Sequence, residues 1–281
     1  MKLNEKLRKL RNQKQLTQEA LAEKLNVSRQ AITKWEKGEG IPDIENITQI
    51  SRFFGITIDE LIKEEKEINL NEQYRYTWKK SLKLTHSKRL ELTIKNMEEI
   101  ILTGSEGDSI EIEIYSNEVE KLEETIQIKI DDPKDLNNRY QLSIRNQENK
   151  KIVKLKLTIP QKLIEQVEMK THTKKITLKE IKLVHLEIDG EVRYVKAIHT
   201  KGYIVFNNGR SDIDLEFNEL VEKLDINLIS SKATLTIPQS SCYVTKNKGR
   251  WTTIEGNHDT EKATNEIELN GLTSKLTILT I

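Results

Sequence analysis

Residues 28–37, with the sequence SRQAITKWEK, place side chains that can bind nucleic acid on one side of a predicted helix. Arg29 can bind the O6/N7 edge of guanine with two hydrogen bonds, and Gln30 can bind the N6/N7 edge of adenine. Both lie near the amino-terminal end of the helix, the part that enters a major groove in helix-turn-helix proteins. Three more side chains suit contacts with phosphate, which position a protein without reading sequence: Thr33, Lys34 and Lys37. This chemistry favours double-stranded DNA as a partner.

The other side of the same segment carries Ile32 and Trp35, which helical spacing brings together and which we expect to be buried. Ser28 is a typical residue for the amino-terminal cap of a helix, and Val27 and Ile32 flank it as a hydrophobic staple. Gly38 supplies the stop. The segment therefore predicts a short helix with one buried face and one DNA-facing face.

A second short helix is predicted just before it. Thr17 is its cap, with Leu16 and Leu21 as the staple. Gln18, in its first turn, can donate to a phosphate together with the free N–H groups of the helix end. Only two residues separate Leu25 from the next cap, so the two helices meet across a tight turn and form a helix-turn-helix.

Three further helices complete the predicted unit. Leu3, Leu7 and Leu10 recur at helical spacing, Pro42-Asp43 opens a helix that ends at Gly55, and Thr57–Glu60 is a capping box for another. Residues 1–66 are therefore predicted to form a five-helix bundle.

Charge is unevenly placed along the chain. The whole chain of 281 residues has a formal net charge of +1, whereas residues 1–42 hold ten Lys and Arg against five acids. A local excess of five positive charges on a small helical domain is expected for a domain that binds a polyanion.

These residues resemble the Cro/C1-type (XRE-like) helix-turn-helix family of bacterial and phage regulators. The resemblance covers roughly residues 3–63 and rests on the L-T-Q-x-x-L-A opening, the V-S-x-x-x-I-x-x-W-E-x-G segment, the fourth helix after I-P-D and the closing D-E-L. It implies that Gln18, Arg29, Gln30, Thr33 and Lys34 face DNA. It also implies an ion pair between Arg11 and Glu36 that ties the first helix to the third.

The pattern changes after the bundle. Residues 67–81 are predicted to be a linker. In residues 82–281, apolar residues alternate with polar ones, as in Ile110, Ile112 and Ile114, which indicates strands. A period of 3.6 followed by a period of 2 predicts two domains with separate cores.

From residue 163 onward the strands repeat about every 20 residues. Leu186, Phe206 and Ile226 stand 20 apart, as do Val195, Leu215 and Leu235. Two strands per repeat favour a β-solenoid, like a single-stranded right-handed β-helix, in which successive coils stack. An antiparallel sandwich built from the same strands is the alternative.

This region also resembles the bacterial DUF4097-type β-strand repeat family, which is similar to adhesin-like solenoids. The resemblance covers roughly residues 85–281. It rests on LTIPQKLIEQVEMKT, on a second LTIP at Leu235–Pro238 and on the closing E-L-N-G-L-T-S-K-L-T-I. It implies no particular ligand.

Other chemistry is not indicated. The five histidines (86, 172, 185, 199 and 258) have no partners at metal-ligand spacing, and Cys242 is the only cysteine. We therefore predict no metal, no cofactor and no enzymatic activity.

The chain has no apolar stretch of roughly 18 residues and no signal peptide at its charged start, so we expect no membrane association and a cytoplasmic location.

The predicted function is that of a sequence-specific transcriptional regulator that binds a palindromic operator as a homodimer. We expect it to act as a repressor. The β domain would dimerise, sense a small-molecule effector or recruit a protein. The alternative is an antitoxin-like or scaffold protein whose β domain binds a partner protein and whose DNA binding serves autoregulation. A carbohydrate-active enzyme on the solenoid is a third possibility, for which no paired carboxylates can be argued.

Overall fold

The computed structural model describes residues 3–14, 16–56, 58–62, 70–84, 88–131, 139–148, 153–256 and 263–281. The chain divides into two compact units, Met1–Gln73 and Tyr74–Ile281. Each has its own hydrophobic core. The architecture is therefore helical at the amino-terminal end and β-rich in the remainder, as the two hydrophobic periods predict.

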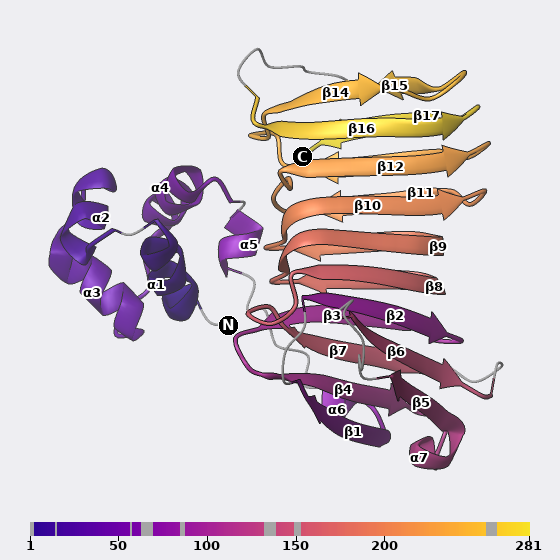
Figure 1. The fold of residues 1–281 in the computed structure, drawn as a ribbon. Coiled ribbons are helices and arrows are strands. Elements are labelled where there is room, and N and C mark those ends of the chain that lie inside the picture. Colours follow the sequence, from indigo (N-terminus) through magenta and orange to yellow (C-terminus); the bar gives the residue numbers. More distant parts are fainter. Residues whose placement is uncertain are drawn as a thin grey trace. The chain divides into compact units, whose positions relative to one another are not determined.

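The amino-terminal unit contains short helices joined by tight turns (Figure 1). Their bounds are α1 Leu3–Gln13, α2 Gln18–Lys24, α3 Arg29–Lys37, α4 Ile44–Phe54, α5 Ile58–Ile62 and α6 Leu70–Gln73. The five predicted helices correspond to α1–α5. The predicted cap at Thr57 lies outside the described residues.

Capping side chains fix where these helices begin. The hydroxyl of Thr17 accepts from the Ala20 N–H, and the hydroxyl of Ser28 accepts from the Ala31 N–H, both at 3.1 Å. Gly38 ends α3 in the left-handed conformation, with φ of 74°, which favours glycine. The sequence signals for the two helices of the helix-turn-helix are thus confirmed.

The β-rich unit contains seventeen strands and one short helix among its described residues. The strands that precede the regular coils are β1 Tyr76–Lys83, β2 Arg89–Lys95, β3 Glu99–Ser105, β4 Ser109–Ser116, β5 Ile126–Asp131, β6 Arg139–Asn146 and β7 Lys154–Pro160, with α7 Leu122–Thr125 before β5. The later ones are β8 Gln166–Lys179, β9 Lys182–Ile198, β10 Lys201–Gly209, β11 Ile213–Phe217, β12 Lys223–Ile229, β13 Lys232–Ile237, β14 Tyr243–Asn247, β15 Thr253–Glu255, β16 Asn265–Leu272 and β17 Lys275–Thr280.

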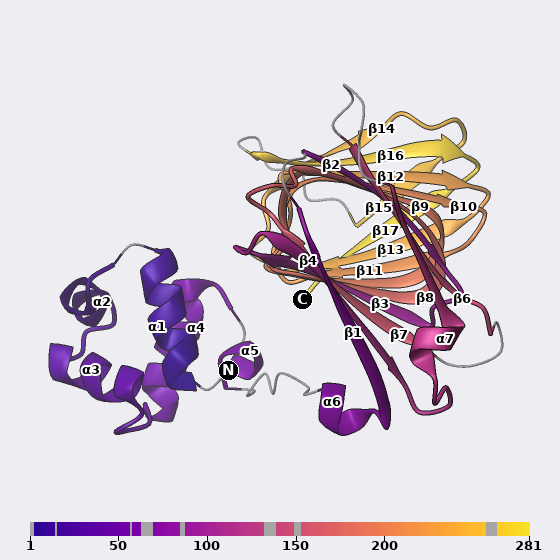
Figure 2. The same ribbon diagram turned by 60° about the horizontal axis from the view of Figure 1, so that its bottom comes forward.

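These strands form the two faces of a solenoid (Figure 2). The first face has the order β5-β6-β2-β8-β9-β10-β12-β16-β14, and the second has the order β1-β4-β7-β3-β8-β9-β11-β13-β17-β15. The long strands β8 and β9 each run through both faces. Among the described strands, pairing is parallel between coils and antiparallel at β1–β4, β4–β7 and β5–β6. The stacked coils are the predicted solenoid, and the antiparallel sandwich is wrong.

Coils at both ends of the stack lie out of chain order. The coil β2–β3 lies between β6–β7 and β8, although it comes first in the sequence. At the other end, β16–β17 lies between β12–β13 and β14–β15.

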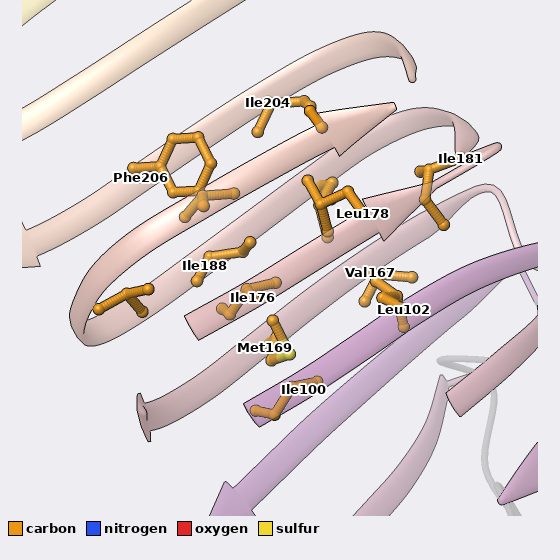
Figure 3. Close-up of a cluster of buried hydrophobic side chains, with 14 of the residues drawn as sticks. Ile100, Leu102, Val167, Met169, Ile176, Leu178, Ile181, Ile188, Ile204 and Phe206 are labelled. Atoms are coloured by element: carbon orange, nitrogen blue, oxygen red, sulfur yellow. The ribbon is translucent and has the colours of Figure 1, made fainter. Parts of the chain in front are cut away.

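Alternate side chains of the coils point into the space between the two faces. Figure 3 shows such a layer, in which Val167, Met169 and Ile188 of one face meet Ile176 and Leu178 of the other. Each of these side chains is almost completely buried. The apolar residues that recur at every second position of the strands are therefore the side chains that form the core of the solenoid.

The predicted 20-residue step is correct at most positions and wrong at one. Leu215 pairs with both Val195 and Leu235, and Phe206 pairs with Ile226. Leu186, however, pairs with Ile204, which is 18 residues away, and not with Phe206. The difference arises because the pairing of β10 with β9 shifts by one residue between Lys201 and Tyr203.

The predicted linker at 67–81 is also too long. The chain divides into its two units between Gln73 and Tyr74, and β1 begins at Tyr76. Tyr76, Trp78 and Leu82 of β1 pack against the β core. Six of the fifteen residues of the predicted linker, 76–81, therefore belong to an edge strand, and residues 67–69 lie outside the described ranges.

Candidate DNA-binding site

Helices α2 and α3 present the polar face that the sequence predicts. Arg29, Gln30, Lys34 and Lys37 are all exposed on α3. The opposite face of α3 is anchored, since Ile32 is completely buried and Trp35 packs against the core of the unit. Long cationic and amide side chains thus project from a helix whose rotation is fixed.

The ion pair predicted between α1 and α3 is present. Arg11 Nε lies 2.6 Å from Glu36 Oε1, and Arg11 Nη2 donates to Glu36 Oε2 at 3.0 Å. Arg11 Nη1 also donates to the carbonyl of Leu16 at 2.7 Å, next to the cap of α2. Because of these bonds, one guanidinium group holds α1, α3 and the start of α2 together.

Glu36 is charged although it is buried. Burial alone would raise the pKa of its carboxyl, but hydrogen bonds from Arg11 and Gln18 outweigh this and hold the pKa below its ordinary value. Its side chain is only 3% exposed, against 12% for Arg11. The pair is therefore a structural element of the site and not a surface contact.

Gln18 and Thr33 belong to the same network. Gln18 Nε2 donates to Glu36 Oε2 at 2.8 Å, and Thr33 Oγ1 donates to Gln18 Oε1 at 3.1 Å. The Thr33 hydroxyl also lies 2.9 Å from the carbonyl of Arg29. Both residues are half-buried. Sequence reasoning predicted them only as DNA contacts and missed that they join α2 to α3.

Glu19 is a further residue at this surface that sequence reasoning missed. Its Oε2 lies 4.0 Å from Arg29 Nη1, and both side chains are more than 60% exposed. An exposed pair of this kind contributes little to stability. It does place a carboxylate beside the predicted guanine-reading side chain.

Two isoleucines that follow α3 in the chain are exposed, although the helical spacing of Ile44, Ile47 and Phe54 predicts an apolar face there. Ile41 is 82% exposed and Ile44 is 77% exposed, in and just after the loop that follows Gly38. The only signal in the sequence is that apolar residues flank Pro42-Asp43, where helix caps are usually polar.

The structure describes three of the five histidines, His172, His185 and His199. Among the described residues, no group of three or more His, Cys, Asp or Glu side chains is arranged to hold a metal ion. His86 and His258 lie outside those residues. No helix within the described ranges is long and apolar enough to span a membrane.

The geometry defines a helix-turn-helix protein, and comparisons agree. The family model for Helix-turn-helix matches residues 7–61. An uncharacterized HTH-type transcriptional regulator of Methanocaldococcus jannaschii is 42% identical over 59 residues, which are 21% of this chain and 89% of the relative. The chain belongs to this Cro/C1-type helix-turn-helix family of transcriptional regulators.

Other relatives are longer. The transcriptional activator BcrR of Enterococcus faecalis is 57% identical over 72 residues, which are 26% of this chain and 35% of the relative. The phage CTXphi transcriptional repressor RstR of Vibrio cholerae is 31% identical over 70 residues, which are 25% of this chain and 62% of the relative. The chain thus spans about a third of the length of the Enterococcus relative.

Two solved structures align with about three quarters of the chain. A proposed cell adhesion protein from Clostridium sporogenes aligns with a TM-score of 0.38 at 13% identity, covering 73% of this chain and all of that one. A proposed adhesin from Bacteroides fragilis aligns with a TM-score of 0.33 at 11% identity, covering 73% of this chain and 98% of that one.

Proposed function

We propose that the protein is a sequence-specific transcriptional regulator that inserts α3 into the major groove of double-stranded DNA. The observation that carries this proposal is the exposure of Arg29 and Gln30 on a helix that Ile32 and Glu36 hold in place. A fixed helix matters because base reading requires side chains aimed at base edges.

The remaining polar residues would bind the DNA backbone. Lys34 and Lys37 are exposed further along α3, where they suit phosphate contacts. One N–H of the Gln18 amide is bonded to Glu36, and the other can donate to a phosphate at the start of α2. Thr33, through its bond to Gln18, would hold that amide in place.

The proposed regulator acts as a homodimer on a palindromic operator in the cytoplasm. A single α3 contacts too few base pairs to be specific in a genome, whereas two copies read half-sites about one helical turn apart. We propose repression as its mode. The relatives named above include an activator and a repressor. A promoter reporter in cells with and without the protein would therefore distinguish repression from activation.

The test of this function is selection of bound duplexes from a random pool by the purified full chain. We expect an inverted repeat to be enriched and to shift in a gel as a complex with two chains. Failure to enrich any sequence at low ionic strength would overturn the proposal.

A second function is favoured by one surface of the β unit. Trp251 is 68% exposed, and the guanidinium of Arg250 lies 4.2 Å from the centre of its ring. Leu272, also exposed, pairs with Ile229 and bridges to Arg250. Because Trp and Arg are enriched at protein interfaces, this corner supports an antitoxin-like or scaffold role with a protein partner. Loss of a stoichiometric partner from pull-downs of Trp251→Ser would support it, and unchanged recovery would oppose it.

A further inference from the structure

One end of the solenoid is formed by β1 and β4 on one face and by β5 and β6 on the other. Helix α7 contacts β1 and β5 there, and its Leu122 is buried. The helix leads directly into Ile126, the first residue of β5. The other end of β5, at Ile130, borders a cavity of about 300 Å³ between the two faces.

This cavity has an apolar lining. Leu84, Leu90, Ile110 and Leu142 line it, and each is at most 5% exposed. Ile130 lines it too and is 39% exposed, so it lies at the mouth. The volume is at the lower limit of the range for small-molecule sites, which are concave and mostly apolar with a few polar groups.

Most polar groups at the mouth already have partners. Lys83 lies 3.5 Å from Asp108. Ser81 Oγ donates to Glu111 at 2.6 Å. Gln141 Nε2 donates to Glu91 at 2.9 Å. These contacts leave little capacity at the rim for recognising a ligand through those side chains.

Lys80 is different. Side chains alternate along a strand, so Lys80 lies on the same side of β1 as Leu82, which lines the cavity, and as Trp78, which packs on the core. Lys80 is nevertheless exposed, and no ion-pair or hydrogen-bond partner for it occurs within the described ranges. Among the described residues, Lys80 is thus a cation with no counter-charge, on the core side of an edge strand and two positions along β1 from the cavity-lining Leu82.

We propose that this cavity binds a small amphiphile with an apolar tail and an anionic head, such as a medium-chain carboxylate. The tail fills the cavity between Leu90, Ile110 and Leu142, and the head pairs with Lys80. Binding depends only on the β unit, whereas any effect of the ligand on DNA binding rests on the function proposed above. Inward charges on edge strands also hinder strand addition, and this alternative role for Lys80 predicts no preference among head groups.

Isothermal titration of the full chain, without DNA, tests the site. The probes are octanoate, octan-1-ol and octylammonium, which share a tail and differ in head charge. We expect saturable binding of one octanoate per chain, with octanol at least tenfold weaker and octylammonium weaker still. Absence of saturable heat with octanoate, or tighter binding of octylammonium, would overturn the proposal.

Two variants locate the ligand. Ile130→Glu puts a carboxylate at the mouth of the cavity and should weaken octanoate binding at least tenfold. Ile229→Glu is the matched control, because Ile229 is 44% exposed and lies far along the same face. Equal octanoate affinity in Ile130→Glu and wild type, with both folded by circular dichroism, would show that the cavity is not the site.

Lys80→Gln tests the head group. It should lower octanoate affinity to that of octanol while leaving octanol affinity unchanged. If Lys80→Gln still binds octanoate as much more tightly than octanol as the wild type does, Lys80 does not bind the head group. Its role would then be to hinder the addition of another strand to the edge strand β1. Since no DNA is present, these results are independent of the DNA-binding proposal.

Discussion

Glu36 on α3 accepts two hydrogen bonds from Arg11 on α1, at 2.6 and 3.0 Å. Glu36 also accepts from Gln18 on α2, so one carboxylate connects three helices. The orientation of the DNA-facing side of α3 therefore depends on a buried charge behind it.

Removing that carboxylate should destabilise the helical unit. Glu36→Ala leaves Arg11 in a half-buried position without its counter-charge, which typically costs about 3 kcal/mol. We expect the helical signal in thermal unfolding to melt at a clearly lower temperature. Glu39→Ala, which removes an exposed carboxylate three residues away, is the control and should melt like wild type.

The base-reading residues should control specificity. Arg29→Ala with Gln30→Ala should reduce discrimination between the operator and a scrambled duplex by about 1–3 kcal/mol for each lost contact. Competition gel shifts measure this difference. If the double variant discriminates as well as wild type, other residues read the bases.

Lys34 should act on all sequences alike. Because it is expected to contact phosphate, Lys34→Ala should weaken binding to operator and scrambled DNA equally. It should also reduce the slope of log K against log salt by about 0.9. A selective loss for the operator would instead assign Lys34 to base reading.

In the β unit, Glu113 should make stability depend on pH. Burial raises the pKa of Glu113, but hydrogen bonds from Lys156, Lys79 and Tyr115 outweigh it and lower the pKa to about 2. Since the ordinary value is 4.5, the unfolded chain binds this proton first as the pH falls. The stabilisation is therefore complete above about pH 4.5 and is lost as the pH falls toward 2.

Denaturant unfolding of wild type and Glu113→Gln at several pH values measures this effect. The difference in unfolding free energy should be about 3 kcal/mol at pH 7 and should shrink steadily below pH 4.5. Glu106→Gln removes one partner of an exposed ion pair with Lys162 and serves as the control. A difference between wild type and Glu113→Gln that stays constant down to pH 2.5 would contradict the assignment.

The helical unit could be predicted well because its signals are local. The caps Thr17 and Ser28 and the stop at Gly38 each act within one turn of the chain. The roles of Gln18 and Thr33 in linking helices could not be predicted, because they depend on side-chain positions brought together by tertiary packing.

The solenoid could be predicted only in part. Alternation identifies the buried side of each strand. The paired strands, however, are far apart in sequence, and an irregularity between Lys201 and Tyr203 places Leu186 opposite Ile204. Strand β1 was missed because Lys79, Lys80 and Lys83 make it resemble a polar linker. The order in which the coils stack could not be predicted, because the spacing of apolar residues does not depend on which coils are neighbours.

That order has a consequence for synthesis on the ribosome. In the described part of the chain, β14 pairs only with β16 and β15 only with β17. The outermost coil is therefore synthesised, and leaves the exit tunnel, before the coil that attaches it to the stack has left the tunnel. Growth of the stack cannot be strictly vectorial at this end. A nascent chain that stops after β15 would lack the β16–β17 coil, through which β14 and β15 pair with the stack, and would leave the edge of β12–β13 uncovered.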